Sequence, residues 1–245
     1  IPFLLSIVMI AVGLYVRFKL EEPPVFAKAA ANNEKVKTPL VEAFKVAWWP
    51  MIQGTFIMVA CYVLFYLMTA WVLSYGIAKA EKGGLAIPYH EFLIIQLVSI
   101  IGFAIFIPIS GWLADKYGRR TQQLWTTIAM AVFGLCFGPL ISPAVVGTGA
   151  NVDTVAVTVF IFIGMCLMGL SFGSMSAYLP ELYPTNVRYT ASGIAYNVAS
   201  ILGAALTPFV AVWLNSSYGV AAVGGYLAFA SILSVVFILL THETR

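Results

Sequence analysis

Long apolar runs without a single Asp, Glu, Lys or Arg are the feature that most limits what this chain can fold into. They cover residues 1–16, 49–77, 92–113, 122–142, 155–179, 190–214 and 219–240. A helix needs about 20 apolar residues to cross roughly 30 Å of bilayer hydrocarbon, and every run except the first reaches that length. We therefore expect an all-α membrane protein with seven transmembrane helices. Because the first run begins at Ile1 inside an apolar pattern, we interpret it as truncated and the chain as a fragment.

Composition supports a membrane protein. Only 9% of the 245 residues are charged and 61% are hydrophobic, whereas a soluble domain carries about 25% charged residues. Lipid must therefore surround most of the chain. Cys61, Cys136 and Cys166 lie inside apolar runs, at spacings that fit neither a disulfide framework nor a zinc site. We interpret them as small buried hydrophobic residues.

The connections between the runs alternate in their content of basic residues. Segment 17–47 holds six Lys and Arg residues, segment 114–121 three and segment 180–189 one, and the last is Arg245. The other set of connections holds only Lys79 and Lys82. The positive-inside rule therefore places 17–47, 114–121, 180–189 and the C-terminus in the cytoplasm, and 78–91, 143–154 and 215–218 outside.

These assignments divide the chain into four segments. We expect a truncated span at 1–16, a cytoplasmic connector at 17–47, a bundle of six helices at 48–240 and a cytoplasmic tail at 241–245. The connector is the one long polar stretch, and its "EEPP" and "AANNEKVKTP" carry mixed charge and helix breakers.

Seven spans are also typical of receptors and retinal pigments, so these classes need separate arguments. A retinal pigment requires a lysine within a span, and no run contains one. The sequence lacks H-E-x-x-H, G-x-S-x-G and an acidic pair at membrane depth, and His90 and His242 lie at span ends. We therefore predict no enzyme, no catalytic residue, no metal site and no cofactor. A heptahelical receptor stays open as the alternative from another class.

The turn "GWLADKYGRR", residues 111–120, concentrates charge in a chain that otherwise has little. A polar hairpin that keeps two helix ends out of the lipid would explain the charges but not their order. Arg119 and Arg120 open a helix, the end that disfavours cations unless they are paired. Gly111 is small enough to allow close approach of a neighbouring helix. This arrangement favours a docking device between helices.

The same residues carry a family resemblance. G-x-L-A-D-K-Y-G-R-R resembles the signature loop of the major facilitator superfamily, which lies between spans two and three and again between spans eight and nine. "YLPELYPTNVRYTASGIAYN", residues 178–197, resembles the segment between spans ten and eleven of sugar porters. "IPFLLSIVMIAVGLYVRFKLEEPPVF" and "YVLFYLMTAWVLSY" resemble spans six and seven of the metabolite:proton symporter family.

The resemblance implies a fold and a function. The chain would be span six, the central loop and the C-terminal six-helix bundle of a twelve-helix transporter, with spans one to five missing. It implies proton-coupled symport of a small organic acid or zwitterionic metabolite by alternating access, in a multi-pass protein of the bacterial inner membrane. A facilitative or sugar-type carrier is the alternative within transport. The implied partners are the solute, a proton, the lipid bilayer and the missing half, with no nucleic acid.

The resemblance also implies a gate on the cytoplasmic face. In sugar porters the basic pair of the eight–nine loop meets the Glu and Arg of the ten–eleven segment. Carried over, this gives a network of Asp115, Arg119, Arg120, Glu181 and Arg188. Gly111, Lys116 and Gly118 complete the turn that holds it. Such a network would latch the cytoplasmic side and break when the two halves rock.

Polar residues within the spans are the candidates for a substrate cavity. Tyr62, Tyr66 and Thr69 form a stripe at helical spacing, and span seven lines the central cavity in this superfamily. Polar positions of three further spans complete the set: Gln96, Ser174, Tyr178 and Asn197. For these the alternative is hydrogen bonding between helices, worth about 0.6 kcal/mol each.

Other residues of the spans have structural interpretations. Gly134 with Gly138 and Gly169 with Gly173 have the spacing of close helix contacts, while Pro108, Pro139 and Pro208 are candidate kinks. A proton carrier needs a titratable group at membrane depth, and these spans contain no carboxylate or histidine. We therefore expect the coupling acid in spans one to five.

Overall fold

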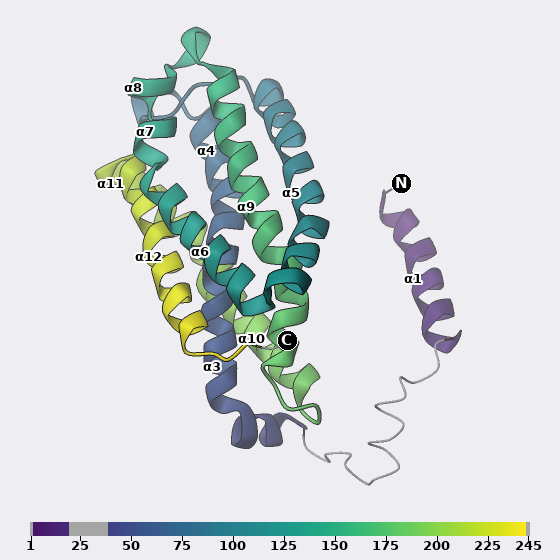
Figure 1. The fold of residues 1–245 in the computed structure, drawn as a ribbon. Coiled ribbons are helices and arrows are strands. Elements are labelled where there is room, and N and C mark those ends of the chain that lie inside the picture. The colour runs from purple at the N-terminus through teal and green to yellow at the C-terminus, as the bar shows by residue number, and fades with distance from the viewer. Residues whose placement is uncertain (1, 20–38, 244–245) are drawn as a thin grey trace.

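The computed structural model describes residues 2–19 and 39–243, and all its regular elements are helices (Figure 1). The α-helices are α1 (Pro2–Lys19), α3 (Pro39–Tyr66), α4 (Val72–Ile77), α5 (Tyr89–Tyr117), α6 (Arg119–Leu135), α7 (Phe137–Ile141), α8 (Pro143–Val146), α9 (Thr154–Glu181), α10 (Arg188–Ser200), α11 (Thr207–Tyr218) and α12 (Val220–Leu239). Two π-helical segments, η1 (Leu67–Trp71) and η4 (Ile201–Ala205), join α3 to α4 and α10 to α11. Two short 3-10 turns are η2 (Ala80–Lys82) and η3 (Gly149–Asn151).

These elements confirm an all-α membrane protein. Within the described residues, five helical segments are long and apolar enough to cross a bilayer: 40–77, 89–117, 154–181, 188–218 and 220–239. A sixth results if α6 and α7–α8, which meet at a 60° bend, form one span. The remaining predicted span corresponds to α1, whose described apolar part, Ser6–Val16, is shorter.

Several helices extend beyond the apolar runs that predicted them. Helix α5 covers Tyr89–Tyr117 instead of 92–113, and α9 continues to Glu181. A helix can continue into the polar interface because its backbone hydrogen bonds do not depend on lipid. The predicted connector at 17–47 is therefore shorter on both sides, since α1 ends at Lys19 and α3 begins at Pro39. Residues 20–38 lie outside the described residues.

Prolines lie close after three of the breaks in the helices. Ala47 leaves the helical conformation, with φ −126° and ψ 18°, three residues before Pro50. Proline lacks the N–H of a helical hydrogen bond and its ring clashes with the preceding turn, which bends the helix at that point. The 60° bend at Cys136 likewise precedes Pro139, and η4 precedes Pro208. Pro108, by contrast, lies inside α5 without interrupting it.

Glycines set the closest helix contacts, as their spacing predicted. A Cβ at Gly169 would lie 2.6 Å from the Phe103 carbonyl oxygen of α5, and one at Gly173 would lie 2.5 Å from that of Ile107. A Cβ at Gly134 would lie 2.7 Å from the Gly224 carbonyl oxygen of α12. These glycines let α9 pack on α5 and α6 pack on α12 with their backbones in contact.

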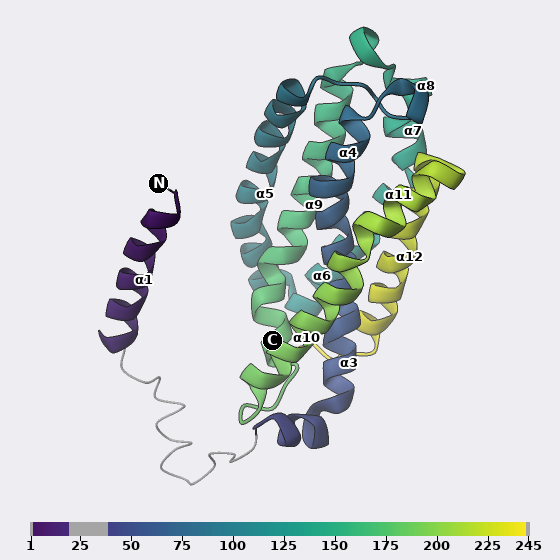
Figure 2. The ribbon, with the colours of Figure 1, turned by 180° about the vertical axis from the view of Figure 1, so that it is seen from behind.

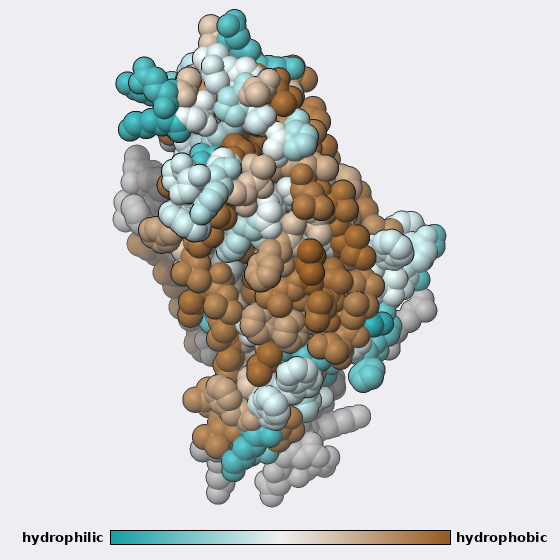
Figure 3. Space-filling model, turned by 90° about the vertical axis from the view of Figure 1, so that its left-hand side faces the viewer, coloured by the Kyte–Doolittle hydropathy of each residue, from teal (hydrophilic) through white to brown (hydrophobic). Residues whose placement is uncertain are grey.

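Helix α3 runs through the bundle between α10 and α12 and carries much of the core. Figure 2 shows α10 and α11 alongside α3 and α4. The face of the bundle seen in Figure 3 has a broad apolar band between polar ends. Among the large apolar side chains outside the core, those of Leu97 and Phe209 are 69% and 78% exposed, as expected for side chains that face lipid. Helix α1 lies apart from the bundle in both ribbon views, and its described side chains are exposed.

Candidate functional site

An ion pair joins α6 to the end of α9. Arg119, the first residue of α6, contacts the Oε1 atom of Glu181, the last residue of α9. Their side chains are 25% and 32% exposed. The Oε2 atom of Glu181 is buried and accepts no hydrogen bond from the described residues. The pair is thus partly shielded from water and fixes two sequence-distant helix ends to each other.

Arg120 makes a different connection, to the end of α12. Its Nε donates to the Ile238 carbonyl at 3.1 Å and its Nη2 to the Leu239 carbonyl at 3.1 Å. A cation at a helix C-terminus interacts favourably with the helix dipole. This explains why an arginine lies in the first turn of α6: its side chain donates hydrogen bonds to the carbonyl groups at the C-terminus of α12.

Glu243 completes this connection from the tail. Its Oε1 accepts from the Arg120 backbone N–H at 3.1 Å, and its Oε2 accepts from the backbone N–H and the hydroxyl of Thr121, both at 3.3 Å. The carboxylate therefore caps the N-terminus of α6, where negative charge is favourable. Sequence analysis missed Glu243, although it is the one acidic residue of the predicted tail.

Gly118 is required by the geometry of this turn. Its backbone has φ 96° and ψ 144°, a conformation that residues with a Cβ rarely adopt. A Cβ at this position would also lie 2.8 Å from the carboxyl group of Glu243.

The structure corrects the extent of the expected network. Asp115 is exposed, with no hydrogen bond or ion pair to any of residues 2–19 and 39–243. The Lys116 ammonium lies 5.0 Å and 5.1 Å from the ring centroids of Trp112 and Tyr117. Arg188 donates from Nε to the Tyr183 carbonyl at 3.4 Å, within its own segment. Of the five charged residues, Arg119 and Glu181 form an ion pair, Arg120 contacts Glu243 and the end of α12, and Arg188 makes a local contact. Asp115 joins none of these contacts within the described residues.

The expected close contact at Gly111 is also corrected. A Cβ at Gly111 would meet no atom within 4 Å in the described part of the chain. The position faces open space because α5 presents this side outward, next to the exposed Trp112.

Tyr183 anchors the segment that follows Glu181. Its ring is 2% exposed and lies against Gly54 of α3, where a Cβ would come close to the phenol oxygen. Burial raises the pKa of the Tyr183 phenol, so the group stays neutral. Its hydroxyl has no partner among the described residues. The absence of a side chain at Gly54 thus leaves room for the Tyr183 ring, which packs the segment after Glu181 against α3.

The residues expected to line a cavity in span seven lie beside its π-helical segment. Tyr62, Tyr66 and Thr69 are half-buried, and the Thr69 hydroxyl donates to the Phe65 carbonyl at 2.7 Å. Tyr196 of α10, which sequence analysis missed, lies close enough to Tyr62 to interact with it electrostatically. Tyr62 thus lies near Tyr66 of its own helix and near Tyr196 of α10.

The other expected cavity residues have structural partners. Gln96 donates to the Met68 and Thr69 carbonyls at 3.3 Å and 2.9 Å, so it satisfies the backbone of η1. Ser174 donates to Gln123 at 2.9 Å between α9 and α6. The buried Tyr178 hydroxyl lies 2.5 Å from that of Thr241. Asn197 is exposed and bonds the Gly193 carbonyl at 2.7 Å. Gln96 and Ser174 thus bond between helices, as in the alternative interpretation, whereas Asn197 bonds within α10.

The predicted substrate cavity and the predicted absence of a metal site are further points of comparison with the described residues. Three of the cavities in the described part of the chain have volumes of about 380, 390 and 490 Å³, and Tyr62 and Tyr66 line none of these three. Among residues 2–19 and 39–243, no group of three or more His, Cys, Asp and Glu side chains is placed to hold a metal ion.

Comparison with known proteins identifies one family and several related transport proteins. The family model described as Major Facilitator Superfamily matches residues 1–201 and 101–245. The chain is 44% identical over its whole length to an inner membrane metabolite transport protein, YhjE, of Escherichia coli strain K12, and covers 54% of it. It is also 44% identical to a putative metabolite transport protein of Haemophilus influenzae, over 100% of this chain and 56% of the relative.

A more distant relative has a name that includes its substrates. A proline/betaine transporter of Escherichia coli strain K12 is 28% identical over 89% of this chain and 42% of its own length. The chain thus spans about half the length of the curated relatives that it matches most fully. These relatives are named transport proteins and not enzymes. No solved structure matches the chain.

Proposed function

Because this chain belongs to the major facilitator superfamily, we propose that it works as the C-terminal half of a secondary transporter that moves a small organic solute by alternating access. In this proposal the solute site lies between this half and a second half of similar size. Family membership also leaves the heptahelical receptor without support.

The observation that carries the proposal is the ion pair between Arg119 and Glu181 at the charged end of the bundle. Both side chains keep part of their surface in water, which lowers the cost of separating them, so the pair can break and re-form during a transport cycle. We propose that the pair holds the ends of α6 and α9 together when the transporter faces outward. Opening on the cytoplasmic side would separate them.

The orientation follows from the distribution of basic residues. We propose that the charged turn at 114–121, the segment at 180–189 and the C-terminus lie in the cytoplasm of a bacterial cell, with 78–91 outside. The Arg119–Glu181 pair and the Arg120–Glu243 connection would then both lie on the cytoplasmic face.

The surface formed by Tyr62, Tyr66 and Tyr196 is the proposed part of this half that faces the solute. Phenols offer hydrogen bonds and ring faces, and ring faces attract ammonium groups. A zwitterionic solute would suit these groups, and a proline/betaine transporter is among the relatives. The apolar runs of α3–α12 hold no Lys or Arg, so an organic acid would take its cation from the other half.

Uptake assays with a full-length transporter that carries this chain test the proposal. Cells that express it should accumulate one member of a panel of radiolabelled betaines, amino acids and organic acids, and a protonophore should abolish the accumulation. Equilibration without accumulation would favour the facilitative or sugar-type carrier. Absence of uptake for the whole panel, despite membrane insertion, would contradict transport of small organic solutes.

We propose further that the proton-coupling acid lies in the other half. At the end of the bundle opposite the charged turn, the candidate titratable residues beside span eight are His90 and Glu91, which are exposed in the first turn of α5. A variant with His90→Gln and Glu91→Gln should keep the pH dependence of uptake. Loss of pH dependence with retained uptake would place the proton site in this half.

A further inference from the structure

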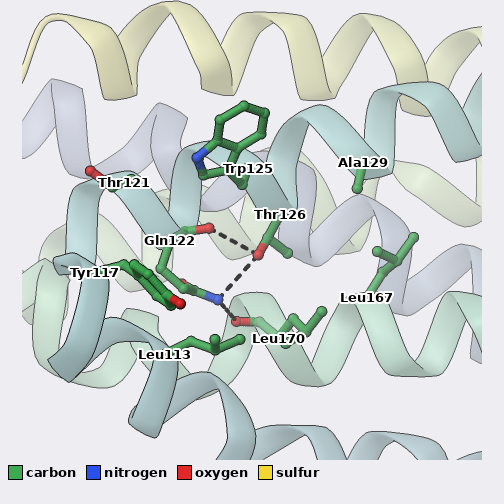
Figure 4. A pocket seen from close by; sticks show the side chains of 9 residues that line it. All are labelled: Leu113, Tyr117, Thr121, Gln122, Trp125, Thr126, Ala129, Leu167 and Leu170. Carbon is green, nitrogen blue, oxygen red and sulfur yellow. Dashed lines mark hydrogen bonds between the residues drawn. The ribbon is translucent and has the colours of Figure 1, made fainter.

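Tyr183, in the segment that follows α9, has a buried hydroxyl without a hydrogen bond. Within residues 2–19 and 39–243, the buried side-chain atoms that lack a partner are Gln122 Oε1, Glu181 Oε2, the Tyr183 phenol oxygen and Ser231 Oγ. The Gln122 amide is satisfied at its other atom, since Nε2 donates to the Leu170 carbonyl at 2.9 Å, a dashed line in Figure 4. Glu181 contacts Arg119 through Oε1. Ser231 lies within α12, whereas Tyr183 lies next to the Arg119–Glu181 pair with its only polar side-chain atom unpaired.

The unpaired hydroxyl is unfavourable if Tyr183 has only a packing role. Its ring occupies the room beside Gly54, next to the side chain of Leu179. Phenylalanine would fill the same room without burying a hydroxyl that has lost its hydrogen bond to water. Tyr75 and Tyr178 are buried to a similar degree, and both of their hydroxyls have partners within the protein. The Tyr183 hydroxyl therefore calls for a partner that the described residues do not supply in this state of the molecule.

Further phenols lead from Tyr183 toward the middle of span seven. Tyr183 lies close enough to Tyr196 of α10 to interact with it electrostatically, and the same holds for Tyr196 with Tyr62 and for Tyr62 with Tyr66. Tyr62 and Tyr196 also pack against the apolar cluster that contains Tyr183. From Gly54, beside Tyr183, to Tyr66, helix α3 advances about 18 Å. The four tyrosines therefore form a succession of phenols from the charged end of the bundle to the proposed solute residues.

The surroundings of these phenols are apolar. Met58 of α3 and Ala195 and Ala199 of α10 belong to the same buried cluster. A polar solute that enters such surroundings loses hydrogen bonds to water, and a hydroxyl along its way replaces them. A neutral phenol donates to an acceptor such as a carboxylate. Each phenol of the succession therefore lowers the cost of moving a polar solute along α3.

Tyr183 closes this succession at the charged end. Its ring is buried against Gly54, so the space beside α3 is filled. Its segment is held there by Glu181, two residues earlier, which pairs with Arg119 of α6. Separation of the ion pair would release the segment and expose the hydroxyl.

We propose that Tyr183 is a solute-binding residue, the last of four phenols that form hydrogen bonds in turn with a polar solute on its way to the cytoplasm. Its ring closes the end of the succession while Arg119 and Glu181 are paired. Its hydroxyl donates to an acceptor of the solute, such as a carboxylate, once they separate. This inference deepens the proposed function and rests on it.

Transport kinetics measured from each side of the membrane test the role of Tyr183 in a full-length transporter. The probe is the member of the radiolabelled panel that the wild type transports. Tyr183→Phe keeps the ring and removes the hydroxyl. In inside-out vesicles, where the solute enters from the cytoplasmic face, the KM of this variant should rise about threefold to tenfold, as for the loss of one hydrogen bond. In right-side-out vesicles its KM should equal that of the wild type, because Tyr183 lies at the other end of the bundle.

Tyr75→Phe is the matched control, near the opposite end of the bundle. The Tyr75 hydroxyl donates to the Ile141 carbonyl at 2.9 Å, so its removal leaves a buried carbonyl without this partner. Tyr75→Phe should lower the thermal midpoint in detergent and leave KM unchanged on both sides. Tyr183→Phe should leave the midpoint equal or raise it, because the lost hydroxyl is unpaired. A lower midpoint of Tyr183→Phe with wild-type KM would mean that the hydroxyl stabilises the fold, which overturns the proposal.

The wild type separates this role from the proposed function. If the wild type transports no member of the panel in either kind of vesicle, the proposed function fails, and the role of Tyr183 fails with it. If the wild type transports the probe and Tyr183→Phe has the same KM in inside-out vesicles, only the role of Tyr183 is wrong.

Discussion

Gly118 shows how one residue determines the turn between α5 and α6. Its positive φ and its contact with the Glu243 carboxylate both exclude a side chain. We predict that Gly118→Ala destabilises the protein by about 1–3 kcal/mol, the usual cost of such a conformation. Gly111→Ala is the control, because Gly111 is helical and a Cβ there has open space. Thermal unfolding in detergent should show a lower midpoint for the first variant and an equal or higher one for the second.

Tyr62 and Tyr66 give a residue-scale prediction for transport. Tyr62→Phe removes one hydroxyl and Tyr66→Ala removes a ring from the proposed solute surface. Both should raise the KM for uptake by about threefold to tenfold, since one lost hydrogen bond is worth about 0.5–1.5 kcal/mol. Cys136→Ala, at the bend between α6 and α7, should leave KM unchanged. If all three variants have the same KM as the wild type, the solute does not bind at span seven, and the proposed site is wrong.

Individual residues could be predicted from the sequence to very different degrees. The resemblances of the charged turn and of residues 178–197 indicated Arg119 and Glu181 respectively, and these two side chains do meet. The Arg120 partners could not be predicted, because they are backbone carbonyls at the end of α12 and a single carboxylate in the tail. No sequence pattern records which helix end lies next to another.

At the scale of elements, the α5–α9 contact depends on glycines. We predict that Gly173→Leu lowers the thermal midpoint by several degrees, because its Cβ would meet the Ile107 carbonyl and the two helices must move apart. Gly225→Leu, on α12, is the matched control, since a Cβ at Gly225 has no neighbour within 4 Å. A similar loss of stability in both variants would mean that glycine removal itself, and not the contact, matters.

The helices could be predicted from the sequence because a helix in lipid requires a long apolar run. Their bends and π-helical segments could be predicted only in part. Pro139 and Pro208 indicated the bend at Cys136 and the π-helix η4. The π-helix η1 has no proline near it. Its Met68 and Thr69 carbonyls are satisfied by Gln96 from α5, a tertiary contact that the sequence of α3 does not contain. Gln96, which was expected to line a cavity, therefore stabilises helix packing.

At the scale of the whole molecule, helices α3–α12 form one bundle, and the contacts of Arg119, Arg120, Glu181 and Glu243 lie at one end of it. The Arg119–Glu181 pair links α6 to α9, and Arg120 with Glu243 links α6 to the end of α12. Helix α6 is thus fixed to two different neighbours at its first turn. A partly exposed ion pair can open while the buried glycine contacts persist, so motion is expected at this end and not in the middle of the bundle.

The central claim is that the Arg119–Glu181 pair forms a latch that the transport cycle requires. A charge exchange in a full-length transporter tests it most directly. Arg119→Glu and Glu181→Arg should each lower the initial rate of solute uptake about tenfold or more, because each places two like charges together at a partly buried site. The double variant restores opposite charges and should recover most of the wild-type rate, at equal surface expression. Uptake at the wild-type rate in both single variants, or a double variant as inactive as the single ones, would contradict the latch.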